Sequence, residues 1–218
     1  MNPPAAAELR EATAAGDTRQ RILDATLEVI GEHGIAGLTN RRVARQAGVS
    51  LGSLTYHFPS QQEALREALE TFVDREVERI AALAAELGPV SLTDAAAAAE
   101  QALDAMSVQA GSLGVLELYL HAGRDPSIRE AARRSWDAYD RVARAILTAV
   151  RVTDPEALAP QVVSLIAGTQ LRWLATGVRS PGALADGLAG LLSGPAGRPG
   201  GPAGRPGDEA ETAQRSRR

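Results

Sequence analysis

The chain of 218 residues contains no cysteine, and all 23 of its basic residues are arginine. Without cysteine, disulfides, thiolate metal sites and cysteine nucleophiles are excluded. Its three histidines are scattered, so we expect no histidine-rich metal centre. Aromatic residues make up only 3% of a chain that is 44% hydrophobic, so the core must consist mainly of Ala, Leu and Val. Because Ala and Leu dominate over β-branched residues, the composition favours helices over sheet.

Long hydrophobic runs are also absent: none approaches the roughly 18 residues that a membrane helix needs. The first residues include acids and no apolar segment typical of a signal peptide, so we expect a cytoplasmic protein with no membrane partner. Residues 1–17 are predicted to be a disordered leader. Residues 194–218 begin with the repeat GPAGRPG and are predicted to be a disordered tail, either without a specific role or weakly phosphate-binding.

Catalytic motifs are missing as well. The chain has no phosphate-binding G-x-x-x-x-G-K-[ST] and no H-E-x-x-H. It has no E-x-x-H pair of the kind that helical-bundle metal oxidases use. Most acidic residues stand among arginines at the spacing of a solvated helix face. We therefore expect no enzyme activity, no metal and no cofactor.

What the sequence does contain is a succession of helical patterns. Apolar residues recur at helical spacing, and Gly, Pro, Ser, Thr and Asp stand where helices would begin and end. The pattern predicts an all-α fold of nine helices, over residues 18–33, 39–47, 50–57, 60–87, 91–110, 112–122, 125–152, 154–176 and 180–194.

The segment from Leu38 to Phe58 predicts two short helices joined by a tight turn. Ala44 allows a close helix crossing, Gly48 takes the positive φ at the end of the first helix, and Ser50 can cap the second. This is the pattern of a DNA-binding helix-turn-helix. Many helical proteins have such turns without touching DNA, so the turn alone leaves both interpretations open.

The distribution of charge supports DNA binding locally. The net charge of −4 looks unfavourable for the whole chain, but residues 39–57 contain three arginines and no acid. Nonspecific DNA affinity depends on positive charge at the contact surface rather than over the whole protein.

Residues 18–69 resemble the N-terminal domain of the TetR/AcrR family of bacterial transcription regulators. The match comprises a first helix closing on HGIAGLT, the AGVS turn, and the exit L-x-Y-H-F into a helix that begins PS. The resemblance implies a three-helix DNA-binding domain over residues 18–66 and a larger effector-binding and dimerisation domain over residues 67–193. It also implies a double-stranded DNA operator, contacted by Thr39, Asn40, Arg41, Leu51, Gly52, Ser53, Thr55, Tyr56, His57 and Gln61.

Two of these positions depart from the family, which commonly has Tyr at position 55 and Lys at position 61. Thr55 and Gln61 can still donate hydrogen bonds to phosphate, but Gln61 adds no charge. We expect a salt dependence that is shallower by about one phosphate contact.

Aromatic and polar residues from several predicted helices form a candidate effector pocket. Packing in an Ala/Leu core is the alternative for each of them. The set is Phe72, Met106, Tyr119, Trp136, Tyr139, Gln170 and Trp173.

The last two predicted helices carry apolar stripes that are candidates for a homodimer interface. The alternative is that the stripes pack only within one chain. The residues are Val162, Ile166, Thr169, Leu184, Leu188 and Leu191.

Taken together, these features predict a repressor that binds a palindromic operator as a homodimer and is released by a small, largely apolar effector. The effector would tilt the helix over residues 60–87 and so change the spacing of the two recognition helices. A DNA-binding or adaptor protein without an effector is the main alternative, and it would have a sealed core. A helical enzyme is the less favoured alternative.

Overall fold

The computed structural model describes residues 3–87, 91–107 and 110–193, except for the side chains of residues 3–15 and 104–110 and a few others inside helices. Within these ranges the chain forms nine α-helices, one short 3-10 helix and no strand, as expected. None of the described helices is both long and apolar enough to span a membrane. The helices are α1 (Pro3–His33), α2 (Asn40–Ala47), α3 (Leu51–His57), α4 (Gln61–Leu87), α5 (Leu92–Ser107), α6 (Ala110–Ala122), α7 (Pro126–Ala149), α8 (Pro155–Thr176) and α9 (Ala183–Ser193).

The first helix corrects the prediction of an unstructured leader. It begins at Pro3, whereas the sequence pattern predicts a start at Thr18. Proline is favoured in a first helical turn, and the residues that follow are rich in alanine, the best helix former. These preferences extend the helix through residues 3–17. The expected tail over residues 194–218 lies outside the described residues.

Local side-chain chemistry sets most of the other helix ends. Thr39 and Ser50 accept hydrogen bonds from the backbone N–H groups of Arg42 and Ser53, and so cap α2 and α3. Asp125 and Asp154 cap α7 and α8, each followed by a proline in the first turn. These caps are the ones that the sequence predicts.

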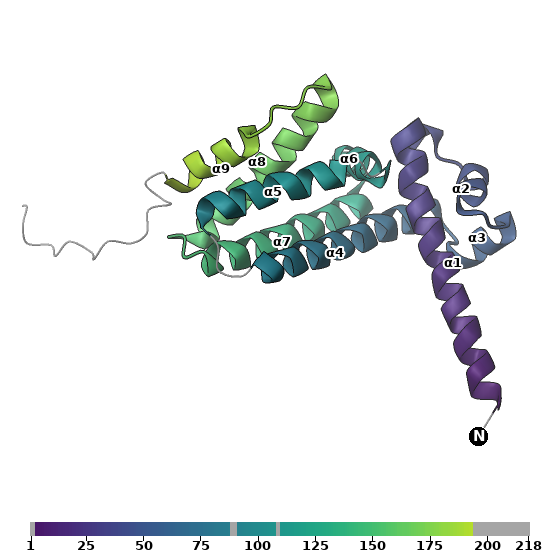
Figure 1. The fold of residues 1–218 in the computed structure, drawn as a ribbon. Coiled ribbons are helices and arrows are strands. Elements are labelled where there is room, and N and C mark those ends of the chain that lie inside the picture. Colours follow the sequence, from purple (N-terminus) through teal and green to yellow (C-terminus); the bar gives the residue numbers. More distant parts are fainter. Residues whose placement is uncertain (1–2, 88–90, 108–109, 194–218) are drawn as a thin grey trace, which may run out of the picture.

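The helices pack around two separate hydrophobic cores. In Figure 1, α2 and α3 lie on one side of α1, and α4 to α9 form the larger body on the other. The first core joins α1, α2 and α3 to the first half of α4, to α6 and to the first half of α7. The second core joins α5, the last part of α7, α8 and α9. The helix-turn-helix is therefore continuous in packing with α6 and α7.

The contact between α1 and α6 is the most extensive of any helix pair, and it is very close. A Cβ atom added to Gly114 of α6 would lie 2.1 Å from the carbonyl oxygen of Leu27 in α1. Only glycine permits this approach, so the two backbones touch without an intervening side chain. Any displacement of α6 must consequently move α1 or break the contact.

Polar contacts join the two parts of the molecule at other points. Arg75 of α4 binds Asp24 of α1 at 2.5 Å, and Gln62 donates to Asp125 at the start of α7 at 3.4 Å. His121, in the last turn of α6, lies 3.7 Å from the same Asp125 carboxylate. α4 is thus tied to the α6–α7 corner at its beginning and to α1 near its middle.

Candidate DNA-binding surface and ligand cavity

The turn between α2 and α3 has the geometry that its sequence predicts. Gly48 adopts the left-handed conformation with φ 64° and ψ 36°, and its N–H bonds back to carbonyls of α2. Ala44, Ala47 and Leu54 are buried in the first core. Small residues at the crossing let α2 and α3 pack tightly, and Val43 of α2 is buried as well, while the other side chains of both helices are exposed or half-buried.

An arginine that the sequence pattern did not single out fixes the end of α3. The guanidinium group of Arg19 makes two hydrogen bonds of 2.6 Å with the carboxylate of Glu67, which raise the pKa of Arg19. It also donates to the carbonyl of His57 at 2.8 Å and lies 4.3 Å from the centre of the Phe58 ring. This Arg19 cluster joins α1, α3 and α4, and it sets the orientation of α3 on the domain.

The ten predicted DNA-contact residues all lie outside the core. Eight of them are exposed, and Ser53 and His57 are half-buried. Tyr56 is 83% exposed and Leu51 is 44% exposed, which are high values for large apolar and aromatic side chains. Core packing therefore does not explain Tyr56, whereas Phe58, at 2% exposed, belongs to the core.

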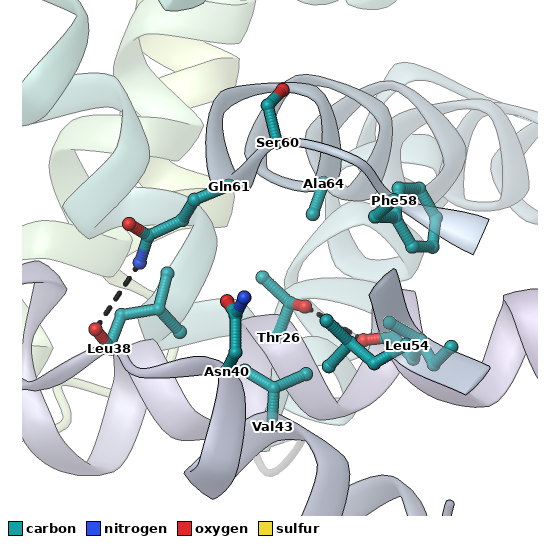
Figure 2. Close-up of a pocket in the computed structure, with 10 residues that line it drawn as sticks. Thr26, Leu38, Asn40, Val43, Leu54, Phe58, Ser60, Gln61 and Ala64 are labelled. Atoms are coloured by element: carbon teal, nitrogen blue, oxygen red, sulfur yellow. Dashed lines mark hydrogen bonds between the residues drawn. The ribbon is translucent and has the colours of Figure 1, made fainter. Parts of the chain in front are cut away.

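Two of the ten residues already use hydrogen-bond donors within the protein. The Thr55 hydroxyl donates to the carbonyls of Leu51 and Gly52, at 3.1 and 3.0 Å. In this conformation the Thr55 hydroxyl proton points to these carbonyls, and its donation to a phosphate stays a prediction. Gln61 donates one of its two amide N–H groups to the carbonyl of Leu38 at 3.2 Å (Figure 2). Its second amide N–H remains for a phosphate.

The crevice drawn in Figure 2 lies between α1, α2, α3 and α4, beside this Gln61 contact. Its volume is about 10 Å³, and apolar residues such as Ile22, Val43 and Phe58 line most of it. That volume is about one water molecule, so it is too small for an organic ligand.

A much larger cavity lies between the two hydrophobic cores. Its volume is about 640 Å³, within the range of ligand sites in proteins. Its wall is formed by α4, α5, α6, α7, α8 and α9, and most of the lining side chains are aliphatic or aromatic. The cavity therefore touches helices of both cores.

Five of the seven predicted pocket residues meet in this wall. They are Phe72, Tyr119, Trp136, Tyr139 and Gln170. Trp173 does not line the cavity, and the guanidinium of Arg179 lies 4.4 Å from the centre of its ring instead. The side chain of Met106 lies outside the described residues.

The cavity wall has few polar groups, and most of them are neutral; the exceptions are Arg79 and Glu86, and Glu86 is exposed to solvent. Burial raises the pKa of both Tyr119 and Tyr139 well above the usual range of tyrosine. The Tyr119 hydroxyl has no hydrogen-bond partner of ordinary geometry, and its ring lies 5.4 Å from that of Trp136. Arg79 lines the wall, but its charge is opposed by the buried carboxylate of Glu76 at 2.8 Å. The interior is thus suited to an uncharged molecule.

Several wall residues were missed by sequence reasoning. Arg79 and Ser112 are polar residues of the wall, and small or aliphatic residues such as Ala96, Ala143 and Val163 make up much of the rest. Alanine and valine give no signal that separates a cavity wall from an ordinary core. Arg79 stands two helical turns after Phe72 on the same face of α4, and this spacing is the sequence signal that points to it.

The residues predicted for a dimer interface are largely used inside the chain. Val162, Leu184 and Leu188 are buried in the second core, so they cannot touch a partner directly. Ile166 lines the cavity, while Thr169 and Leu191 are half-buried. The outer faces of α8 and α9 carry other residues, including Leu171, which is 51% exposed, and Gly168 and Gly190, which have open space beside them.

Comparison with known proteins gives two family matches that together cover most of the chain. Residues 22–69 match the family described as bacterial regulatory proteins, tetR family. Residues 91–198 match the tetracyclin repressor-like C-terminal domain. The first match contains the helix-turn-helix and the second contains α5 to α9.

Individual relatives agree with this assignment. CymR of Pseudomonas putida, an HTH-type transcriptional regulator, is 34% identical over 132 residues, which cover 57% of this chain and 61% of CymR. A putative transcriptional regulator of Streptomyces coelicolor, SCO7518, is 34% identical with a TM-score of 0.60, covering 80% of this chain and 97% of that one. The multidrug binding protein EbrR, solved with imidazole, is 32% identical with a TM-score of 0.61, covering 79% and 93%. EbrR has also been solved with ethidium and with proflavin.

Proposed function

Because this chain belongs to the TetR family of bacterial transcriptional regulators, which are DNA-binding proteins and not enzymes, we propose that it is a ligand-responsive repressor. In this proposal a homodimer binds a palindromic operator, and a small apolar molecule releases it. The observation that supports the ligand response most directly is the cavity of about 640 Å³ between the two cores. An adaptor without an effector has no use for so large an apolar cavity.

The DNA-binding part of the proposal assigns residues 18–66 to the operator. Thr39, Asn40 and Arg41 at the start of α2 would bind phosphate, and α3 would lie in the major groove. The exposure of these side chains and the rigid support of α3 by the Arg19 cluster favour that assignment. As a regulator of chromosomal genes the protein would act in the cytoplasm.

The effector part of the proposal assigns the cavity to an uncharged, largely apolar and aromatic molecule. Aromatic rings of Phe72, Tyr119, Trp136 and Tyr139 offer stacking surfaces, and Gln170 can orient one polar group. A charged ligand would lose its hydration, and the charge of Arg79 in the wall is already balanced by Glu76. EbrR, a multidrug binding protein solved with imidazole, with ethidium and with proflavin, is a precedent for a site that accepts more than one compound.

We propose that α6 transmits the ligand signal. Ser112, Val115 and Tyr119 of α6 line the cavity, while Gly114 on the same helix touches α1. A ligand that displaces α6 would therefore move α1 as well as α4, and with them the position of α3. Ligand and operator would then compete through linkage, because each prefers a different arrangement of the same helices.

For the homodimer we propose the outward faces of α8 and α9, around Leu171, Gly168 and Gly190. Changing Leu171 to Asp should convert the dimer to a monomer in light scattering, because it places a charge in the apolar contact. Changing Leu120 to Asp is the matched control, since Leu120 is 68% exposed on α6 and should leave the dimer intact. A Leu171→Asp variant that remains dimeric would exclude this surface.

The ligand response can be tested with phenylnaphthylamine, a neutral and largely apolar fluorescent probe. In a Trp173→Phe variant, Trp136 is the one remaining tryptophan of the chain, so quenching of its emission reports on the cavity wall. We expect saturable quenching by phenylnaphthylamine. Anilinonaphthalene sulfonate has the same rings plus a negative charge, and it should bind at least about tenfold more weakly. Equal binding of both probes, or no quenching, would contradict the assignment.

A further inference from the structure

The recognition helix α3 has an unusual set of side chains for a DNA-reading element. Its sequence is LGSLTYH, which contains no Arg, Lys, Asn, Gln, Asp or Glu. Arg and Lys are the usual partners of guanine, and Asn and Gln are the usual partners of adenine, through paired hydrogen bonds in the major groove. α3 cannot make either of these paired contacts.

Beside the polar side chain of Tyr56 and those of the half-buried Ser53 and His57, α3 exposes apolar groups. Leu51 is 44% exposed although it is a large aliphatic residue. Thr55, one helical turn later, has its hydroxyl proton committed to the carbonyls of Leu51 and Gly52, so it has no donor for a base. Residues four apart lie on the same face of a helix, so Leu51 and Thr55 form a continuous apolar strip.

Gly52 lies between them and is not required by the fold. A Cβ atom there would meet only the Ser50 hydroxyl oxygen at 3.8 Å, and its φ is not positive. Glycine in a helix costs about 1 kcal/mol relative to alanine. A position that accepts this cost without a packing reason is one where another molecule approaches the backbone closely.

We propose that α3 reads its operator through the methyl groups of thymine. The thymine methyl is the apolar group that DNA bases display in the major groove, and Leu51 with the methyl of Thr55 offers a complementary apolar strip. Gly52 lets the helix backbone approach the base edges closely enough for these contacts. Leu51 and Thr55 are therefore specificity-determining residues for A·T pairs under α3. This inference rests on the DNA-binding role proposed above.

The test begins with selection of the full chain on a library of random duplex DNA. The enriched duplex is then synthesised with deoxyuridine in place of thymidine, one position at a time, which removes only the methyl group. We expect an affinity loss of about fourfold at one or two positions in each half-site, from the burial of one methyl group. Replacing guanine by deazaguanine, which lacks the N7 acceptor, in the neighbouring G·C pairs should change the affinity by less than about twofold.

Two variants connect the methyl effect to this helix. Leu51→Ala should bind thymidine and deoxyuridine duplexes equally at its position, while folding normally because Leu51 is exposed. Gly52→Ala should raise the melting temperature and yet weaken operator binding by about tenfold or more. Enriched half-sites that are insensitive to deoxyuridine, or a methyl effect that survives Leu51→Ala, would overturn the inference and leave the regulator role intact. A selection that enriches no sequence would overturn both.

Discussion

The crossing of α6 over α1 at Gly114 leads to a sharp prediction about stability. Replacing Gly114 by Ala adds a single methyl group, whose carbon would lie 2.1 Å from the Leu27 carbonyl oxygen. Ordinary contact begins at 3.4 Å, so the two helices must separate by about 1.3 Å at this point (3.4 less 2.1). Both partners are helix backbone, so no side chain can rotate away to relieve the clash.

The expected cost follows from two opposing effects. Overpacking of this kind costs up to about 3 kcal/mol, and replacing glycine by alanine within a helix returns about 1 kcal/mol. The net loss of about 2 kcal/mol corresponds to a fall in melting temperature of about 4–8 °C for a chain of this size. Thermal unfolding followed by circular dichroism measures the shift.

Gly111 is the matched control, because it lies on the same helix but has room. A Cβ atom there would meet Phe72 and Leu27 side-chain atoms at 3.6 and 3.7 Å, which is ordinary contact. Gly111→Ala should therefore melt at the same temperature as the wild type or slightly higher. If Gly114→Ala melts as high as Gly111→Ala, the close α1–α6 contact does not exist in solution, and the proposed route of the ligand signal fails with it.

Three further predictions concern the helix-turn-helix and the cavity. Arg19→Ala should lower the free energy of unfolding by about 1–3 kcal/mol in urea titrations and weaken DNA binding, because Glu67 and the His57 carbonyl lose their partner. An unchanged free energy of unfolding would show that the Arg19 cluster does not stabilise the domain. Gly48→Ala should cost about 1–2 kcal/mol, because a side chain is strained at φ 64°, and a neutral effect on the urea midpoint would refute this. In a Tyr56→Phe variant, absorbance at alkaline pH should show that Tyr119 and Tyr139 ionise only as the protein unfolds, because burial raises the pKa of both in the folded state. The stability that these two tyrosines contribute is therefore fully present below about pH 10, the pKa of unfolded tyrosine, and is lost as the pH rises above it. Reversible ionisation of both in the folded protein would contradict their burial.

Local features of this structure were predictable from sequence because their causes are local. Gly48 ends α2 in the left-handed conformation, and Asp125 caps α7, since each depends only on neighbouring residues. Most of the aromatic residues of the cavity wall were predictable, because the few large rings of this chain come from several helices and pack together where those helices meet. Five of the seven residues do line the cavity.

Other features depend on contacts that no local pattern encodes. The stripe of Leu184 and Leu188 indicates a buried face, but a stripe does not say whether α5 of the same chain or a second chain covers it. The Arg19–Glu67 pair and the Gly114–Leu27 contact join segments far apart in the sequence. Glu100 of α5 caps the start of α9 by accepting from the N–H groups of Gly182 and Ala185, which is likewise a tertiary contact.

The central claim is that a molecule in the cavity controls DNA binding, and one titration tests it most directly. The full chain is bound to its selected duplex, labelled with fluorescein, and phenylnaphthylamine is added while anisotropy is followed. The account predicts that the probe releases the DNA, and that an Ile166→Trp variant, whose added rings fill part of the cavity, binds the same duplex but no longer responds to the probe. Anisotropy that stays constant in the Trp173→Phe variant, while quenching of Trp136 emission shows the cavity to be occupied, would contradict the account.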